Sequence, residues 1–194
     1  MGRKLEFSYD HAVEQATRVF WAKGYRAASM RDLLKAMGIG EGSFYHLFRS
    51  KNHLYLQCLR HYNDTVMQRW LAALEAEPSV RKGMRDLFRA LLATVDDPTT
   101  PHVCLIARSL SPEVLAQKQL ESYVTGELMK FQQSLSARLE KAMGTGELPG
   151  DFQPQISAQI LFTFMQGYFR VVRVLKSREQ MWREIEALLS RLGL

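Results

Sequence analysis

The sequence predicts an all-α protein of about nine helices. Residues that favour helix, above all Leu, Ala, Glu, Arg, Met and Gln, dominate the 194-residue chain, which contains only six prolines. Apolar residues recur at three- and four-residue spacing in one segment after another, whereas the alternating Val, Ile and Thr runs typical of strands are missing. Hydrophobic residues make up 46% of the chain and charged residues 24%, which is the usage of a folded globular protein.

Three helices are predicted near the N-terminus. The first follows Ser8 or Asp10, either of which can cap it, and ends at Gly24. The second follows Ser29 and stops after barely two turns, and the third runs from about residue 41 to residue 48.

A larger helical body is predicted after them. Ser50 caps a long helix that begins at Lys51 and continues to about Glu75, before Pro78 breaks the chain. The further predicted helices cover residues 79–95, 103–109, 112–143, 154–176 and 177–192. The stretches DDPTTP at 96–101 and GTGELPGD at 144–151 are the predicted breaks.

The stretch SMRDLLKAMGIGEGSFYHLF, residues 29–48, has the pattern of a helix-turn-helix. Ser29 forms a near capping box with Asp32, and Gly38 permits the positive φ of a sharp turn. The Ile39 side chain is expected to pack between the two helices. In this motif the second helix enters the major groove of DNA. We therefore expect a DNA-binding unit over residues 1–52 and an effector-binding and dimerisation domain over 53–194.

The outer face of the third helix, between its apolar anchors, carries side chains suited to DNA. A tyrosine hydroxyl can donate to a phosphate, and a histidine can bond a base edge or a phosphate. A glutamate at the helix start can accept from cytosine N4, and small residues permit close approach. The residues predicted to bind DNA are Ser29, Arg31, Glu41, Gly42, Ser43, Tyr45, His46 and Lys51.

The charge distribution fits this interpretation. The chain carries a net charge of +6, and residues 1–60 hold ten Lys or Arg against five acidic residues. Positive charge gathered in the first third is typical of a nucleic-acid binder, because neutralising phosphates releases counterions. Two plainer alternatives are a basic surface without a partner and an αα-hairpin within an ordinary bundle.

No membrane, metal or catalytic function is predicted. The longest apolar run, 160–165, is too short to span a bilayer, and the N-terminus lacks a signal-peptide core, so we expect a cytoplasmic protein. Cys58 and Cys104 have no CxxC spacing, and His53, Gln57 and His61 lack the pattern of a zinc site. No Gly-x-Ser-x-Gly or Walker sequence occurs, so we expect neither an enzyme nor a cofactor.

Residues 8–60 resemble the DNA-binding domain of the tetracycline-repressor (TetR) family. The stretch FWAKGYRAASMRDLLKAMGIGEGSFYHLFRSKNHL is similar to that family's pattern almost position by position. The resemblance implies a homodimeric repressor that binds a palindromic operator and is released by a small-molecule effector. PHVCLIARSLS is similar to a branch that carries Gly-Cys-Leu around this cysteine and in part senses electrophiles, with Val103 in place of that glycine. The alternative function is a helical protein-protein adaptor or a bundle that does not bind DNA.

Cys104 and the body's aromatic and Met residues have two interpretations each. A helix N-terminus and Arg108 could lower the pKa of the Cys104 thiol, but a small buried residue is favoured. The candidate ligand-binding residues are Met67, Trp70, Phe88, Cys104, Phe131, Phe164 and Tyr168. The candidate dimer-interface residues, on two apolar stripes, are Ile160, Phe164, Gly167, Val171, Ile185 and Leu189. The alternative is that these side chains simply form the core.

Overall fold

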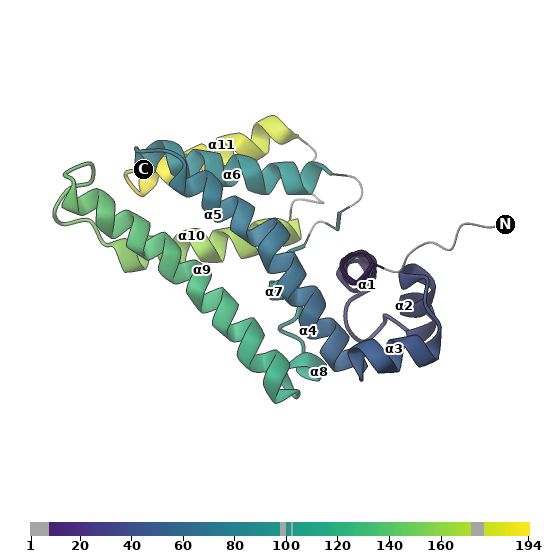
Figure 1. Ribbon diagram of the computed structural model, residues 1–194. Helices are drawn as coiled ribbons and strands as arrows, with labels where there is room; N and C mark the ends of the chain where they lie inside the picture. Colours follow the sequence, from purple (N-terminus) through teal and green to yellow (C-terminus); the bar gives the residue numbers. More distant parts are fainter. Residues whose placement is uncertain (1–7, 98–99, 102, 172–176) are drawn as a thin grey trace.

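The computed structural model describes residues 8–97, 100–101, 103–171 and 177–194, and every regular element in this part of the chain is a helix (Figure 1). The prediction of an all-α fold is confirmed. A small N-terminal bundle, called the head below, contains α1, α2 and α3 (Figure 1). A helical rod leads from the head into a larger body.

The head folds as its helix caps predict. It consists of α1 (Tyr9–Lys23), α2 (Met30–Met37) and α3 (Glu41–Phe48), packed on the start of α4. The Ser8 hydroxyl accepts the His11 amide at 3.3 Å, so Ser8 rather than Asp10 caps α1. Phe20, Leu33, Phe44 and Phe48 are fully buried and form the centre of the head.

The rod is α4 (Lys51–Tyr62), the π-helical segment η1 (Asn63–Met67) and α5 (Gln68–Glu75). Its extent matches the single helix predicted over 51–75, and the Ser50 hydroxyl caps it as expected. The π-helical turn was not predicted, because it has no Gly or Pro signature. Segments of this kind are frequent at functional sites.

The body packs along both halves of the rod. Its helices are α6 (Val80–Asp96), α7 (Leu105–Arg108), α8 (Pro112–Leu115), α9 (Lys118–Gly144), α10 (Pro154–Val171) and α11 (Arg178–Arg191). The helix predicted over 112–143 is wrong in one respect: extended backbone at Gln117 separates α8 from α9. Residues 172–176, the predicted end of α10, lie outside the described residues.

A tight helical hairpin joins α5 to α6. Gly83 is buried, and a Cβ atom there would lie 2.4 Å from the Leu74 main-chain oxygen, so only glycine fits. The intervening turn is held by the buried Arg138 of α9, whose guanidinium donates to the main-chain oxygens of Glu77 at 2.9 Å and Pro78 at 2.8 Å. The hairpin is therefore fixed by the close backbone approach at Gly83 and by the Arg138 side chain that holds its turn.

Polar contacts fix the head against the body. The Trp21 indole N–H on α1 donates to the Val103 carbonyl at 2.5 Å, and the Tyr55 hydroxyl hydrogen-bonds Ser109 at 2.6 Å. The Asn52 amide, also on α4, donates to the Gln117 side chain at 2.8 Å. These contacts join α1 and the start of α4 to the body and so hold the head in one orientation.

Candidate nucleic-acid interface

The turn between α2 and α3 has helix-turn-helix geometry. Gly38 takes the left-handed conformation, with φ 67° and ψ 28°, and its amide donates to the Leu34 carbonyl. The Ile39 amide donates to the same carbonyl at 3.2 Å, and its side chain is half-buried between the helices. The backbone thus turns sharply at the residue where the sequence predicted it.

Helix α3 is anchored by one face and exposed on the other. Phe44 and Phe48 are fully buried, with ring centroids 5.8 Å apart, and Tyr9 stacks on Phe48 at 5.3 Å. Glu41, Gly42, Ser43, Tyr45 and His46 are exposed, as required for contact with a partner. We call these five residues the α3 face.

Two members of the α3 face have properties that favour contact with a partner. Tyr45 is 54% exposed, yet its ring packs edge-on against the buried Phe44 at 5.2 Å, which orients the side chain outward. A Cβ atom at Gly42 would meet nothing within 4 Å in the subunit. Glycine weakens a helix, and the packing of the subunit does not require it at position 42. A partner that approaches the helix closely would explain its presence.

The start of α2 is a complete capping box with Asp32. The Ser29 hydroxyl accepts the Asp32 amide at 3.1 Å and donates to the Asp32 carboxylate at 2.7 Å. The Lys23 ammonium lies 2.8 Å from that carboxylate and, with Ser29, holds the pKa of Asp32 well below its usual range. The Ser29 hydroxyl is thus already engaged, and a phosphate bound by it would compete with Asp32. Arg31 is exposed beside it.

The corner between α3 and α4 places the remaining predicted cation. Lys51 is half-buried, with its ammonium 4.7 Å from the centre of the Tyr25 ring, and burial lowers its pKa. His53 hydrogen-bonds the Phe48 carbonyl at 2.9 Å, which closes the corner. Arg49, which the sequence prediction omitted, is exposed there with φ 60°. In the sequence, the one feature that could have pointed to Arg49 is its position between the end of the third predicted helix and Ser50, the cap of the fourth.

The predicted ligand-binding residues do not share one cavity. Trp70 lines a cavity of about 510 Å³, Met67 and Phe131 line a groove of about 460 Å³, and Cys104 lines a pocket of about 120 Å³. Phe88, Phe164 and Tyr168 line none of these three, and pack as rings 6.0 Å and 5.0 Å apart. Residues of the head and of α6, which the prediction missed, complete the 510 Å³ cavity.

The cysteines are buried. Cys58 lies in the core between α4 and α1, with its thiol 3.7 Å from the Val13 carbonyl oxygen. Cys104 is 1% exposed, and burial raises the pKa of its thiol. The backbone amides of Ala107 and Ile106, in α7, lower this pKa, but desolvation outweighs them, in agreement with the small buried residue favoured from the sequence. No set of three or more His, Cys, Asp or Glu in the described residues could hold a metal.

The predicted dimer residues divide into exposed and buried sets. On α10, Ile160 is 40% exposed and Val171 48% exposed, Gly167 is exposed, and Phe164 is half-buried. Ile185 and Leu189 of α11 are fully buried within the subunit, so their assignment to an interface is corrected. A helical stripe shows that one face is apolar but not which neighbour covers it. No helix in the described part of the chain is long and apolar enough to cross a membrane.

Comparison with known proteins identifies the family. Residues 12–58 match the family described as "Bacterial regulatory proteins, tetR family". The chain is 30% identical over 155 residues to the uncharacterized HTH-type transcriptional regulator YezE of Bacillus subtilis, covering 78% of each chain. It is 28% identical to the HTH-type transcriptional repressor DhaR of Mycobacterium sp. (strain GP1), over 87% of this chain and 84% of that protein.

Solved structures agree with this fold. A cysteine mutant of the TetR family transcriptional regulator CifR, complexed with 26-bp double-strand operator DNA, superimposes with a TM-score of 0.86 and 27% identity. That match covers 97% of this chain and 98% of the other. Reduced Escherichia coli NemR shares the fold, with a TM-score of 0.74 at 22% identity over 94% of each chain. The chain therefore belongs to the TetR family of bacterial regulatory proteins, and it is a DNA-binding transcription regulator rather than an enzyme.

Proposed function

We propose that the chain is a cytoplasmic repressor that binds a palindromic operator as a homodimer and releases it when a small molecule binds the helical body. Residues 1–52 read the DNA, and residues 53–194 bind the effector and dimerise. The observation that carries the proposal is the α3 face, which is exposed while Phe44 and Phe48 fix the helix from beneath. The similarity of this chain to CifR, whose structure was solved in complex with operator DNA, supports the proposal that the α3 face binds DNA.

The α3 face divides into base-reading and phosphate-binding groups. We assign base-edge contacts to Ser43 and His46, close approach to Gly42, and a phosphate contact to Tyr45. Glu41, at the start of the helix, accepts a hydrogen bond from cytosine N4, and its negative charge repels phosphates.

Cations around α3 hold the backbone of the duplex. Arg31 on α2 and Lys51 on α4 flank the motif, and Ser29 contributes the start of α2 rather than its engaged hydroxyl. Half-burial over Tyr25 leaves Lys51 fewer conformations to lose on binding. The newly located Arg49 joins this group.

Dimerisation through α10 explains why apolar side chains remain exposed. Ile156, Ile160 and Val171 are 57%, 40% and 48% exposed in the single subunit. Such a surface is typical of a self-complementary interface. A twofold axis there gives two copies of α3, and half-sites about 34–36 Å apart would place both in successive major grooves.

Operator binding provides the direct test. A gel shift with the DNA upstream of the chain's own gene should show a complex that Tyr45→Ala and Lys51→Ala weaken at least about tenfold, or about 1.4 kcal/mol. Lys141→Ala, an exposed lysine on α9, is the matched control and should bind as wild type does. If wild type binds no DNA and Tyr45→Ala changes nothing, the adaptor alternative is favoured instead.

A further inference from the structure

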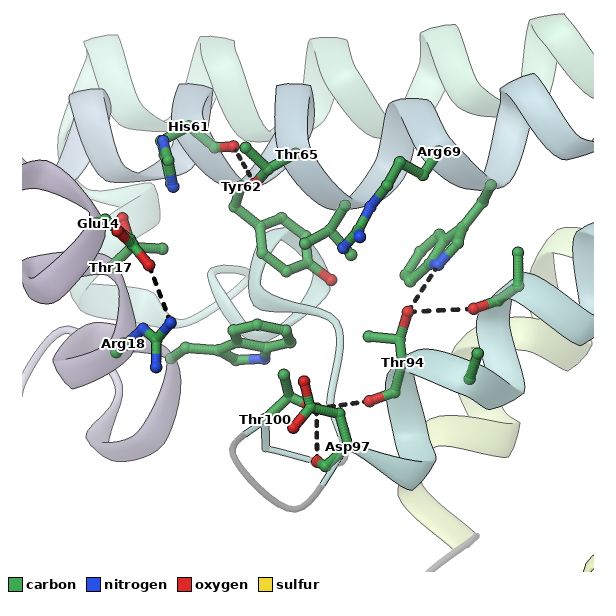
Figure 2. A pocket seen from close by; sticks show the side chains of 15 residues that line it. Glu14, Thr17, Arg18, His61, Tyr62, Thr65, Arg69, Thr94, Asp97 and Thr100 are labelled. Carbon is green, nitrogen blue, oxygen red and sulfur yellow. Dashed lines mark hydrogen bonds and ion pairs between the residues drawn. The ribbon is translucent and has the colours of Figure 1, made fainter. Parts of the chain in front are cut away.

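The largest of the three cavities described above lies between the head and the body. It has a volume of about 510 Å³, within the range of small-molecule sites. One wall is α1, the second is the rod, and the third is the end of α6 with Asp97 and Thr100 (Figure 2). A molecule bound there would touch the DNA-reading unit and the body at once.

The rod presents two parallel stripes to this cavity. Tyr62, Val66 and Trp70 form an apolar stripe, and their sequence neighbours His61, Thr65 and Arg69 form a polar one. In an α-helix, each residue lies about 40° further round the axis than the residue four positions before it, so the two steps of each stripe would drift by about 80°. The π-helical segment Asn63–Met67 has more residues per turn and reduces this drift. Both stripes therefore face the cavity.

Aromatic rings fixed in place make the floor. Trp21 and Tyr62 are buried and meet edge-on at 4.9 Å. The Trp21 N–H is bonded to the Val103 carbonyl, and the Trp70 N–H donates to the Thr94 hydroxyl at 3.1 Å. Since both indole donors are occupied, the Trp21 and Trp70 rings offer a ligand apolar surface only, which suits a flat, apolar body.

The charged groups at the rim favour an anion on the rod side. Arg18 is paired with Glu14 at 2.8 Å, so these two offset each other. Arg69 makes no ion pair within the described part of the chain, and its side chain extends from α5 toward the cavity (Figure 2). His61 lies on the same polar stripe. Asp97 lines the opposite rim of the cavity, away from Arg69 (Figure 2).

We propose that this junction cavity is the effector site, and that its ligand is a small molecule with a flat apolar body and one anionic group bound by Arg69. The proposal rests on the proposed repressor function. A ligand that spans α1 and α6 fixes the angle between head and body, and so shifts the equilibrium between DNA-binding and released states. The effector and operator then weaken each other's binding by the same factor.

Two dyes with the same aromatic body test the site and the ligand class. 8-Anilinonaphthalene-1-sulfonate carries an anionic group, and N-phenyl-1-naphthylamine does not. Fluorescence titrations of the full-length protein give the dissociation constant of each dye. Wild type should bind both, with the sulfonate tighter.

Variants locate the binding. Ala93→Trp fills the cavity and should weaken both dyes about tenfold or more, whereas Ala137→Trp, at an exposed alanine lining the separate groove of Met67 and Phe131, should change neither. Arg69→Gln should weaken the sulfonate about tenfold while N-phenyl-1-naphthylamine stays within about twofold. Arg191→Gln, an exposed arginine at the end of α11, is its control.

The outcomes separate the cavity from the repressor function. Dye binding that is absent in wild type, or unchanged in Ala93→Trp, overturns the site. Equal effects of Arg69→Gln on both dyes overturn the anionic class. Operator affinity is measured with and without dye on each protein. A wild type that binds operator while dye has no effect on that affinity overturns the effector role and leaves the repressor standing. A wild type that binds dye but no operator overturns the repressor instead.

Discussion

Trp21 and Val103 are 82 positions apart in the chain, and the indole N–H of the first donates to the carbonyl of the second at 2.5 Å. This bond joins α1 of the head to the segment that precedes α7 of the body. It also orients the Trp21 ring that forms part of the junction cavity. One hydrogen bond therefore contributes both to the angle of the head and to the shape of the site proposed for the effector.

Removing the Trp21 donor should weaken the contact between head and body while an aromatic ring still fills the site. Trp21→Phe keeps a buried aromatic ring but leaves the Val103 carbonyl without its partner and removes part of the ring volume. We expect the free energy of unfolding to fall by about 1–3 kcal/mol in urea titrations. Trp182→Phe, at a half-buried tryptophan of α11, should cost less. An equal loss in both variants would contradict the role given to the bond.

Gly42→Ala should separate stability from DNA binding. Because a Cβ atom at this position meets nothing in the subunit, alanine should raise the free energy of unfolding by about 0.5–1 kcal/mol. The same methyl group should weaken operator binding in anisotropy titrations. Gly126→Ala on α9, where a Cβ atom also meets nothing, should stabilise similarly with unchanged operator affinity. Equal operator affinity in both variants would remove Gly42 from the interface.

Gly83→Ala should do the opposite. The added Cβ atom would lie 2.4 Å from the Leu74 main-chain oxygen, which cannot move without separating α5 from α6. We expect a loss of about 1–3 kcal/mol in the free energy of unfolding, measured by urea titration. Stability equal to wild type would show that the hairpin can open at no cost.

The Asp32 capping box predicts a pH dependence. The pKa of Asp32 is lowered in the folded protein by Lys23 and Ser29, so the unfolded state binds its proton first. The stabilisation is present above the unfolded pKa, at about 3.9, and is lost as the pH falls through the folded value. Asp32→Asn should therefore lower the melting temperature at neutral pH, and the difference from wild type should shrink below about pH 4. Asp151→Asn, in an exposed turn, should show no such convergence.

Ile160→Asp tests the proposed dimer. A carboxylate at this 40% exposed site on α10 would be desolvated in an apolar interface but harmless in a monomer. Analytical ultracentrifugation should show dissociation, and operator binding should fall with it. Leu110→Asp, at a residue 49% exposed outside α10, should remain dimeric. A dimeric Ile160→Asp protein would place the interface elsewhere.

Local chemistry explains which features could be predicted from the sequence. The Ser29 capping box, the Gly38 turn and the Ser50 cap depend on residues within four positions, so their patterns are readable directly. Phe44 and Phe48 follow from helical spacing alone. The division of α8 from α9 and the π-helical turn depend on packing between distant helices, and they have no local signature.

The candidate sites show the same division. The exposure of the α3 face is set by anchors on the same helix, so it could be anticipated. Ile185 and Leu189 were assigned to an interface because periodicity cannot distinguish another subunit from the chain's own core. The His61, Thr65 and Arg69 stripe looks like an ordinary solvated face in the sequence, and only the fold shows that it lines a cavity together with α1 and α6.

The shared rod limits how this regulator can be re-engineered. Leu54, Cys58 and Tyr62 are buried on the part of α4 that packs against α1, whereas Trp70 belongs to the body a few turns later on the same rod. A chimaera of two related regulators spliced at residue 52 would separate α1 from the buried side chains of α4 against which it packs. A functional chimaera should instead have its crossover after Met67, so that α1 and the part of the rod that packs against it come from the same protein.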